Sequence, residues 1–315
     1  MTIDDRVMDT REKIGFRLRE LYAGYGYSRY RMSKFEEYDL YSRHRDFLFS
    51  DGVITFTDTG GRLMALKPDV TLSIVKNGKD TPGEVRRLYY HEHVYRVTGA
   101  ADGFREQTQV GLECTGDLRD GETAEVLKLA SESLKLCAEN HVLEVSHLGI
   151  LEAFVDMLAP NPRARERILE CAGEKNLHGI SGICRESGLA EGAEEPLRKL
   201  LTLGGTPRSV MPAVRQLAAD FGCGSAAAEL SRALTVFTGT EAEGRIRIDF
   251  SATGNLKYYN GIICRGFISG IPDCVLSGGQ YDTLMRTMGR RDRAIGFAVF
   301  LDPLERLTEV EKVHA

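Results

Sequence analysis

The sequence lacks the features that mark disulfide-bonded, zinc-binding, membrane-spanning and secreted proteins. Its seven cysteines are widely spaced and form no C-x-x-C pair, so we expect neither a disulfide framework nor a zinc site. The longest apolar run near the C-terminus, Ala294 to Leu301, has eight residues, whereas a bilayer-spanning helix needs about 18. The first residues lack the basic lead and apolar core of a signal peptide. We therefore predict a cytoplasmic protein with buried thiols at Cys114, Cys137, Cys171, Cys184, Cys223, Cys264 and Cys274.

The chain also has fewer basic residues (41 Lys and Arg) than acidic ones (46 Asp and Glu). The net charge of −5 has the wrong sign for a general nucleic-acid binder, so we expect no nucleic-acid partner. The hydrophobic fraction of 42% and the charged fraction of 28% are typical of globular proteins. A length of 315 residues fits one large domain with an insertion as well as two domains.

The first half of the chain has three segments of different hydrophobic period. Apolar residues at helical spacing predict a helix from Asp9 to about Leu21. Short alternating runs between Tyr27 and Cys114 predict an antiparallel sheet. Residues 121–140 predict a second long helix, whose apolar stripe would pack on that sheet. The hairpin turns are expected at Asp51-Gly52, Gly60-Gly61 and Gly78.

The second half predicts a helical insertion that interrupts the sheet. Residues 151–243 are rich in Ala, Leu and Glu, and residues 244–315 return to β character before a short tail helix. We therefore predict an α+β fold in which 1–150 and 244–315 are the two parts of one core. Breaks between the inserted helices are expected at Pro160, Pro162, Gly204-Gly205 and Pro212, and the late strands at Arg245–Phe250, Ile262–Ile268, Cys274–Leu276 and Ala294–Leu301.

Two histidines offer a weak metal signal. His91 and His93 would face the same side of one strand. A metal site needs further converging ligands, and the sequence places none nearby. We therefore expect no metal and assign both histidines to packing.

Several short motifs occur in the order that one known family has them. Together they resemble the catalytic domain of the class II histidyl-tRNA synthetases, over nearly the whole chain and with a helical insertion at the corresponding place. The resemblance implies a class II synthetase-like antiparallel sheet flanked by helices. The motifs are Tyr25-Gly26-Tyr27 with Phe35-Glu36, Leu66-Lys67-Pro68-Asp69-Val70-Thr71, Tyr95-Arg96, Phe104-Arg105, Gln109-Val110-Gly111-Leu112-Glu113, Tyr258-Tyr259-Asn260-Gly261, Gly278-Gly279-Gln280-Tyr281-Asp282 and Gly296-Phe297-Ala298.

The same resemblance shows which catalytic groups are missing. Arg96 is kept where the family holds the α-phosphate of ATP, and Arg105 is retained with it as a vestigial nucleotide-binding residue. Adenylation relies on cations that stabilise the developing phosphate charge, and the arginine at the end of motif 3 is replaced by Pro303. We therefore expect no synthetase activity and no cofactor, with Arg306 more simply a solvated charge than a substitute. The remaining departures are Thr98, Gly254, Lys257, Gln280 and Asp302. Because only 12 residues follow Pro303, we expect no anticodon-binding domain.

The amino-acid pocket of the family is kept in part. The resemblance places Asp69 and Thr71 at the ligand's ammonium group and Gln109 and Glu113 on one face of a strand that lines the same site. It places Tyr258 and Tyr259 where the family closes on an imidazole ring. Taken from the residues alone, the polar pair could be an ordinary polar strand face and the tyrosines could be core aromatics.

A synthetase-like chain with these losses resembles the regulatory subunits of ATP phosphoribosyltransferase in histidine biosynthesis. The resemblance implies a noncatalytic protein that pairs with a short-form catalytic subunit and conveys histidine feedback by differential affinity. It also implies a homodimer within the hetero-oligomer, although Ser33 replaces the motif 1 proline. Two alternatives stay open: an amino-acid-activating synthetase paralogue with an acceptor other than tRNA, and a sensor of uncharged tRNA.

Overall fold

A large, mostly antiparallel sheet forms the centre of the molecule. The computed structural model describes residues 7–48, 52–97, 103–253 and 258–306. Within these ranges nine strands form one sheet in the order β1-β5-β6-β12-β11-β10-β7-β9-β8, and only β1 with β5 and β7 with β9 are parallel pairs. The predicted α+β fold is confirmed. The strands of this sheet are β1 (Ser28–Arg29), β5 (Val85–Val97), β6 (Phe104–Gly116), β7 (His141–His147), β8 (Gly204–Gly205), β9 (Ile246–Asp249), β10 (Ile262–Ile268), β11 (Leu276–Gln280) and β12 (Arg293–Phe300).

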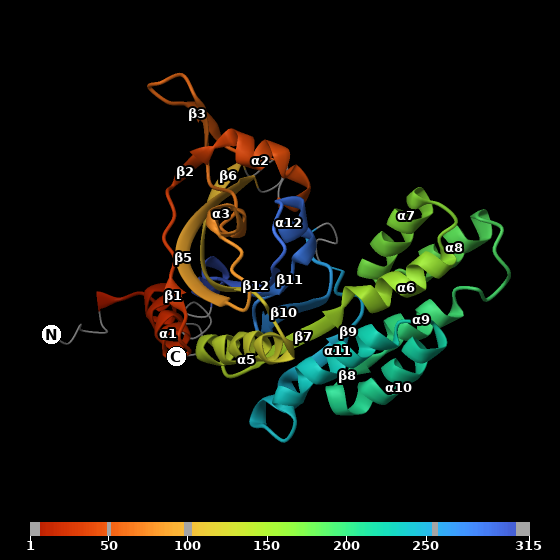
Figure 1. Ribbon diagram of the computed structural model, residues 1–315. Coiled ribbons are helices and arrows are strands. Elements are labelled where there is room, and N and C mark those ends of the chain that lie inside the picture. The colour runs from red at the N-terminus through yellow and green to blue at the C-terminus, as the bar shows by residue number, and fades with distance from the viewer. Residues whose placement is uncertain (1–6, 49–51, 98–102, 254–257, 307–315) are drawn as a thin grey trace.

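Helices flank this sheet, and a small second sheet projects from it (Figure 1). The small sheet has the order β2-β4-β3, from β2 (Phe35–Glu37), β3 (Thr55–Thr57) and β4 (Leu63–Leu66). The α-helices are α1 (Thr10–Gly24), α2 (Tyr38–Arg43), α3 (Thr71–Asn77), α5 (Asp120–Cys137), α6 (Leu148–Leu158), α7 (Pro162–Gly173), α8 (Leu177–Glu186), α9 (Glu195–Thr202), α10 (Pro207–Asp220), α11 (Gly224–Leu234) and α12 (Asp282–Thr287). Single 3₁₀ turns are η2 (Arg45–Phe47), η3 (Thr235–Phe237), η4 (Glu241–Arg245) and η5 (Asp302–Leu304).

The two long helices α1 and α5 form where the apolar spacing predicted them. Asp9 caps α1 through a capping box with Glu12, which satisfies two backbone N–H groups at the helix start. The buried face of α1 reaches α5, where the Tyr22 hydroxyl lies 2.9 Å from Ser133 Oγ. The apolar stripe of α5 packs on β7, β10 and β12. These two helices therefore cover one face of the sheet.

Part of the region expected to be purely β is helical. Residues 38–43 form α2 and residues 71–77 form α3. Gly78 ends α3 and does not turn a hairpin. The Gly60-Gly61 turn between β3 and β4 is confirmed, since Asp58 Oδ1 accepts hydrogen bonds from the N–H groups of Gly60 and Arg62. The expected turn at Asp51-Gly52 lies partly outside the described residues.

Two further details of the sequence reading were wrong. Pro212 lies inside α10 and does not break it. A proline there removes one helical N–H, but Pro212 and Arg208, whose carbonyl loses that donor, are both exposed, so water can satisfy the carbonyl. The strand expected at Cys274–Leu276 instead runs from Leu276 to Gln280, because the Gly278-Gly279 pair is itself strand. Except for Glu305 and Arg306, the segment expected as a tail helix beyond η5 lies outside the described residues.

The cysteines and histidines were expected to be buried, and only some of them are. All seven cysteines are free, but Cys137, Cys171 and Cys274 are partly exposed. Cys137 and Cys171 lie at the margin of the packed interior. His93 is exposed beside Thr108 and Glu106. In the described part of the chain no group of three or more His, Cys, Asp or Glu side chains is placed to hold a metal ion.

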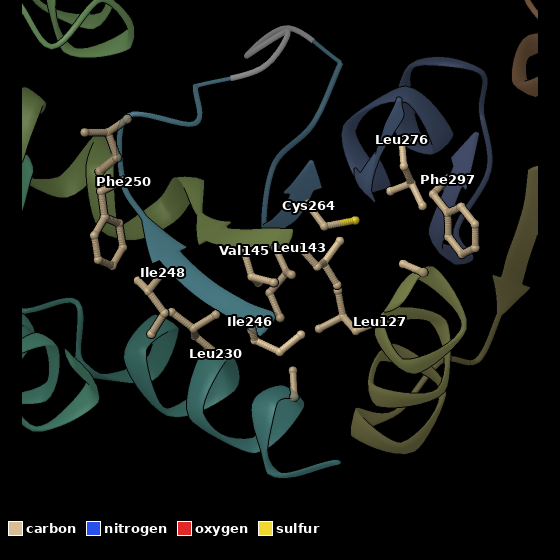
Figure 2. Packing of buried hydrophobic residues seen from close by; sticks show 14 of the residues in the cluster. Leu127, Leu143, Val145, Leu230, Ile246, Ile248, Phe250, Cys264, Leu276 and Phe297 are labelled. Carbon is tan, nitrogen blue, oxygen red and sulfur yellow. The ribbon is translucent and has the colours of Figure 1, made fainter. Parts of the chain in front are cut away.

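Helices α6 to α11 lie together beside the β7-β9-β8 edge of the sheet (Figure 1). They share an apolar interior with the core: Figure 2 shows Leu230 of α11 facing Ile246 and Ile248 of β9. Gly204 and Gly205, between α9 and α10, add the edge strand β8 to this sheet. No helix in the described ranges combines the length and apolarity that crossing a membrane requires.

The apolar interior of these helices can be tested at Phe154. Its ring is fully buried in α6, 4.6 Å from the ring of Phe221 between centroids. We expect Phe154→Ala to lower the free energy of unfolding by about 3–5 kcal/mol, because it leaves a cavity. Met157→Ala on the same helix is the control, since Met157 is 45% exposed and such changes stay within about 0.5 kcal/mol. Equal shifts of the urea midpoint in the two variants would contradict this packing.

Candidate functional site: a buried acidic pocket

A recess opens on the face of the sheet opposite α1 and α5. It encloses about 370 Å³ of empty space, including the solvent at its mouth. Strands β6, β11 and β12 form its floor. The start of α3 and residues 258–259 form its walls. The structure brings all six residues predicted for the amino-acid site to this recess, together with Arg96. The full lining is Asp69, Thr71, Tyr90, Arg96, Gln109, Glu113, Tyr258, Tyr259, Ser277, Tyr281, Gly296, Phe297, Ala298 and Phe300.

Glu113 lies at the centre of the recess and is only 3% exposed. Its carboxylate accepts a hydrogen bond of 2.6 Å from Thr71 Oγ1 and one of 2.7 Å from the Tyr281 hydroxyl. The pKa of Glu113 is raised to about 8, mainly by burial and in smaller part by the nearby Asp69, while the two hydroxyl donors act in the opposite direction. At neutral pH the folded protein therefore holds this carboxyl mainly in its protonated form.

Asp69 is the second buried carboxyl group and also has a structural role. Its Oδ1 accepts a 2.8 Å hydrogen bond from the N–H of Leu72 in the first turn of α3. Burial raises the pKa of Asp69, while this N–H and the nearby Arg96 act in the opposite direction. Arg96 is itself held by the carbonyl of Pro68 and the side chain of Gln107. Asp69 thus lies near a cation, Arg96, that other groups orient.

Gln109 supplies an acceptor that has no donor. The side chain is 2% exposed, and its Oε1 has no hydrogen-bond partner among the described residues. An unpaired buried acceptor costs about 1–3 kcal/mol, so this group is better satisfied when something else fills the recess. Gln109 and Glu113 lie four residues apart on β6 and line the same recess, and together with Asp69 they offer acceptors suited to an ammonium group.

Tyrosines surround the acceptors. The rings of Tyr258 and Tyr259 lie 4.7 Å apart between centroids, and the ring of Tyr281 lies 5.9 Å from that of Tyr258. Burial raises the pKa of each of these phenols, as it does for Tyr90. The hydroxyls therefore stay protonated and can donate hydrogen bonds inside an otherwise apolar wall.

A glycine beneath the carboxylate makes this arrangement possible. Gly296 on β12 lies directly opposite Glu113 on β6. A Cβ at position 296 would overlap Glu113 Oε2. The glycine of the Gly296-Phe297-Ala298 motif is thus required by the close approach of the Glu113 side chain to the sheet.

Other predicted residues lie elsewhere. Arg105 is exposed on β6, opposite Arg96, and does not line the recess. Arg306 pairs with Asp273 at 3.1 Å and is half exposed. Asp302 accepts from the N–H of Thr108. Thr98, Gly254 and Lys257 lie outside the described residues.

The sequence reading missed three polar residues of the pocket. Tyr90 alternates along β5 with residues of the other face, a period-2 signal that could have placed it. Tyr281 stands in the Gly278–Asp282 motif, but only the fold shows its hydroxyl on Glu113. Ser277 precedes the same motif and lines the floor.

The raised pKa of Glu113 generates a test that needs no ligand. The folded protein holds this proton more tightly than the unfolded chain does. The unfolded chain therefore ionises first, and the free energy of unfolding falls as the pH rises from about 5 to 8. We expect Glu113→Gln to remove this loss, so that the difference in thermal midpoint, variant minus wild type, grows with pH. Glu106→Gln, on the exposed part of the same strand, should show no such growth. A difference that stays constant from pH 5 to 8 would contradict the assignment.

The chain matches a known protein family. The family model described as Histidyl-tRNA synthetase matches residues 3–304. The chain is 26% identical over 283 residues to an ATP phosphoribosyltransferase regulatory subunit of Oceanobacillus iheyensis, which covers 89% of this chain and 69% of the relative. It is 27% identical over 305 residues to a histidine–tRNA ligase of Methanococcus maripaludis, covering 94% of this chain and 72% of that one.

Solved structures show the same fold. An ATP phosphoribosyltransferase regulatory subunit/histidyl-tRNA synthetase from Bacillus halodurans C superimposes with a TM-score of 0.83 at 24% identity, covering 96% of this chain and 81% of that chain. The ATP phosphoribosyl transferase (HisG:HisZ) complex from Thermotoga maritima contains a chain that superimposes with a TM-score of 0.71 at 19% identity, covering 93% of this chain and 97% of that one. Since the family model matches most of its length, the chain belongs to the histidyl-tRNA synthetase family.

Proposed function

We propose that this chain is a noncatalytic, cytoplasmic regulatory subunit of ATP phosphoribosyltransferase that binds histidine in the acidic pocket. The observation that carries the ligand is the unsatisfied Gln109 Oε1 beside the buried carboxyl groups of Asp69 and Glu113. An amino acid brings an ammonium group, which donates to several acceptors at once. The tyrosine wall suits a flat ring such as imidazole.

The proposal that the protein is noncatalytic rests on the residues that would bind ATP. By resemblance, Pro303 occupies the position of the motif 3 arginine, and a proline carries no charge. The carboxylate of its neighbour Asp302 accepts a hydrogen bond from the N–H of Thr108 and lies 3.6 Å from Arg11. Arg96 alone would leave the developing phosphate charge of adenylation poorly stabilised. A pocket of this kind can sense an amino acid without activating it.

The proposed partner is a short-form ATP phosphoribosyltransferase catalytic subunit. The relative from Oceanobacillus iheyensis is named as a regulatory subunit, and the Thermotoga maritima structure is described as a complex. In our proposal the chain forms a homodimer within such a hetero-oligomer. Histidine would bind one state of the assembly better than another and so lower the rate of the catalytic subunit.

The similarity to a histidine–tRNA ligase supports activation of an amino acid as a competing function. In this alternative the acceptor is a molecule other than tRNA. This alternative requires exchange between pyrophosphate and ATP that depends on the amino acid. The assay therefore separates an enzyme from a sensor.

Histidine binding provides the first test of the proposal. Glu113→Ala removes a charge-assisted acceptor worth about 1.5–3 kcal/mol, so calorimetry should show histidine affinity about tenfold weaker or more. Asp69→Ala should also weaken binding, whereas the exposed Glu106→Ala should not. Because the ammonium favours ionised Glu113, whose pKa in the empty pocket is about 8, wild-type affinity should rise from pH 7 to 8 with proton release. Identical affinities in all four proteins would place the ligand elsewhere.

Reconstitution provides the second test. Mixed with a short-form catalytic subunit, the chain should form a hetero-oligomer detectable by light scattering. Transfer of phosphoribosyl from phosphoribosyl pyrophosphate to ATP should be faster in the complex, and histidine should lower that rate, with a shift in affinity between states of about 5- to 150-fold. Absence of both a complex and a rate change would remove the regulatory function. Histidine-dependent pyrophosphate exchange abolished by Arg96→Ala would favour the enzyme instead.

A further inference from the structure

Gln280 connects segments of the pocket that are distant in sequence. Its side-chain Oε1 accepts a hydrogen bond from the backbone N–H of Ile262, and its backbone carbonyl accepts one of 3.0 Å from the N–H of Asn260. Both bonds hold the segment that carries Tyr258 and Tyr259. The next residue, Tyr281, donates to Glu113 inside the recess. Gln280 thus fixes two walls of the pocket from outside it.

The space for this side chain is provided by Gly261. A Cβ at position 261 would overlap Gln280 Oε1. The carbonyl of Gly261 in turn accepts a 2.9 Å hydrogen bond from the N–H of Leu148, the first residue of α6. The start of the inserted helices is therefore tied to the same segment.

The inserted helices also reach Gln280 directly, through Glu229 of α11. Glu229 Oε1 accepts hydrogen bonds of 2.9 Å from Gln280 Nε2 and 3.1 Å from Arg293 Nη2, and Oε2 lies 3.5 Å from His147 Nε2. These donors lower the pKa of Glu229 to about 2, with His147 the largest cause. Gln280 and His147 are 3% and 4% exposed. Glu229 therefore reaches into the core at the ends of three strands.

We propose that Glu229 is a positioning residue for the amino-acid pocket: by holding Gln280, it makes the position of helices α6–α11 and the occupancy of the pocket depend on each other. This inference rests on the proposed pocket for its ligand. The contacts themselves do not depend on the ligand.

The physical basis is a short, stiff connection. Gln280 and Tyr281 are consecutive at the end of β11, and one side chain bonds to α11 while the other bonds to Glu113. A displacement of α11 that pulls on Gln280 must move Gln280 Oε1, which accepts from the Ile262 N–H, or the Tyr281 hydroxyl. Coupling of this kind acts in both directions, because a ligand that fixes Tyr281 also fixes Gln280. The helices α6–α11 thus form a surface on which a partner subunit could sense the state of the pocket.

The test compares two polar contacts that join α11 to the core. Glu229→Ala removes the contact with Gln280, and Glu229→Gln keeps an oxygen acceptor for it. Arg232→Ala is the matched control, since Arg232 of α11 pairs with Asp120 of α5 at 2.6 Å, exposed and away from the pocket. A general loosening of α11 would affect the Glu229→Ala and Arg232→Ala variants alike.

Two readouts are needed, one with ligand and one without. Without ligand, amide exchange of Ile262 should be about tenfold faster in Glu229→Ala and unchanged in Arg232→Ala. With L-histidine, calorimetry should show about fivefold weaker binding or more in Glu229→Ala, little change in Arg232→Ala, and recovery toward wild type in Glu229→Gln. In a Glu113→Gln background the Glu229→Ala change should have a much smaller effect, because the path through Tyr281 is already altered.

The outcomes separate this inference from the proposed function. If wild type binds no histidine, the proposed function fails, and the exchange of Ile262 still decides whether Glu229 positions Gln280. If histidine binds but Glu229→Ala and Arg232→Ala weaken it equally, Glu229 is only a structural tether. Unchanged exchange at Ile262, or full additivity with Glu113→Gln, would overturn the proposal.

Discussion

The burial of one carboxyl group, Glu113, constrains the rest of the site. A carboxyl group in the interior requires donors, and here they come from Thr71 at the start of α3 and from Tyr281 after β11. It also requires room above the sheet, which Gly296 provides from β12. Segments more than two hundred residues apart in sequence thus meet at a single side chain, and their packing against each other defines the recess.

The electrostatic balance of this site is suited to binding a cation more than to chemistry on phosphate. Two carboxyl groups have raised pKa values, and Gln109 leaves a buried acceptor unsatisfied. Such a pocket is destabilising when empty and gains most from a ligand that donates several hydrogen bonds with positive charge. The cost of holding these groups without a partner is consistent with a site whose occupancy changes the state of the protein.

The helices inserted between β7 and β9 are joined to this site by more than apolar packing. Leu230 and its neighbours share an apolar interior with β9 (Figure 2). This packing holds the helices against the sheet, but it is not directional and does not fix their exact position. Hydrogen bonds through Glu229 and Gln280 do specify one, since they are directional and largely shielded from water. Gln280 is therefore part of the contact between the two regions.

Periodicity in the sequence determined the long elements. The stripes of α1 and α5 and the paired strands β5 and β6 were predicted because each buries one continuous face. The same reasoning missed α3, since Thr71-Leu72-Ser73-Ile74-Val75 has the composition of a strand. That segment is helical because it is buried against the recess, with Asp69 accepting from its first turn, and these are tertiary causes.

The sequence by itself also determined the family and the set of acceptors in the pocket, because the motifs stand in a fixed order along the chain. It did not determine which side chains touch. The contact of Tyr281 with Glu113, the unsatisfied Gln109 oxygen and the reach of Glu229 to Gln280 depend on strand order and register. A one-residue change of register would turn the strand side chains among these, such as Gln109, Glu113 and Gln280, to the other face of the sheet. Only the tertiary structure decides register, since it follows from how all the strands and helices pack at once.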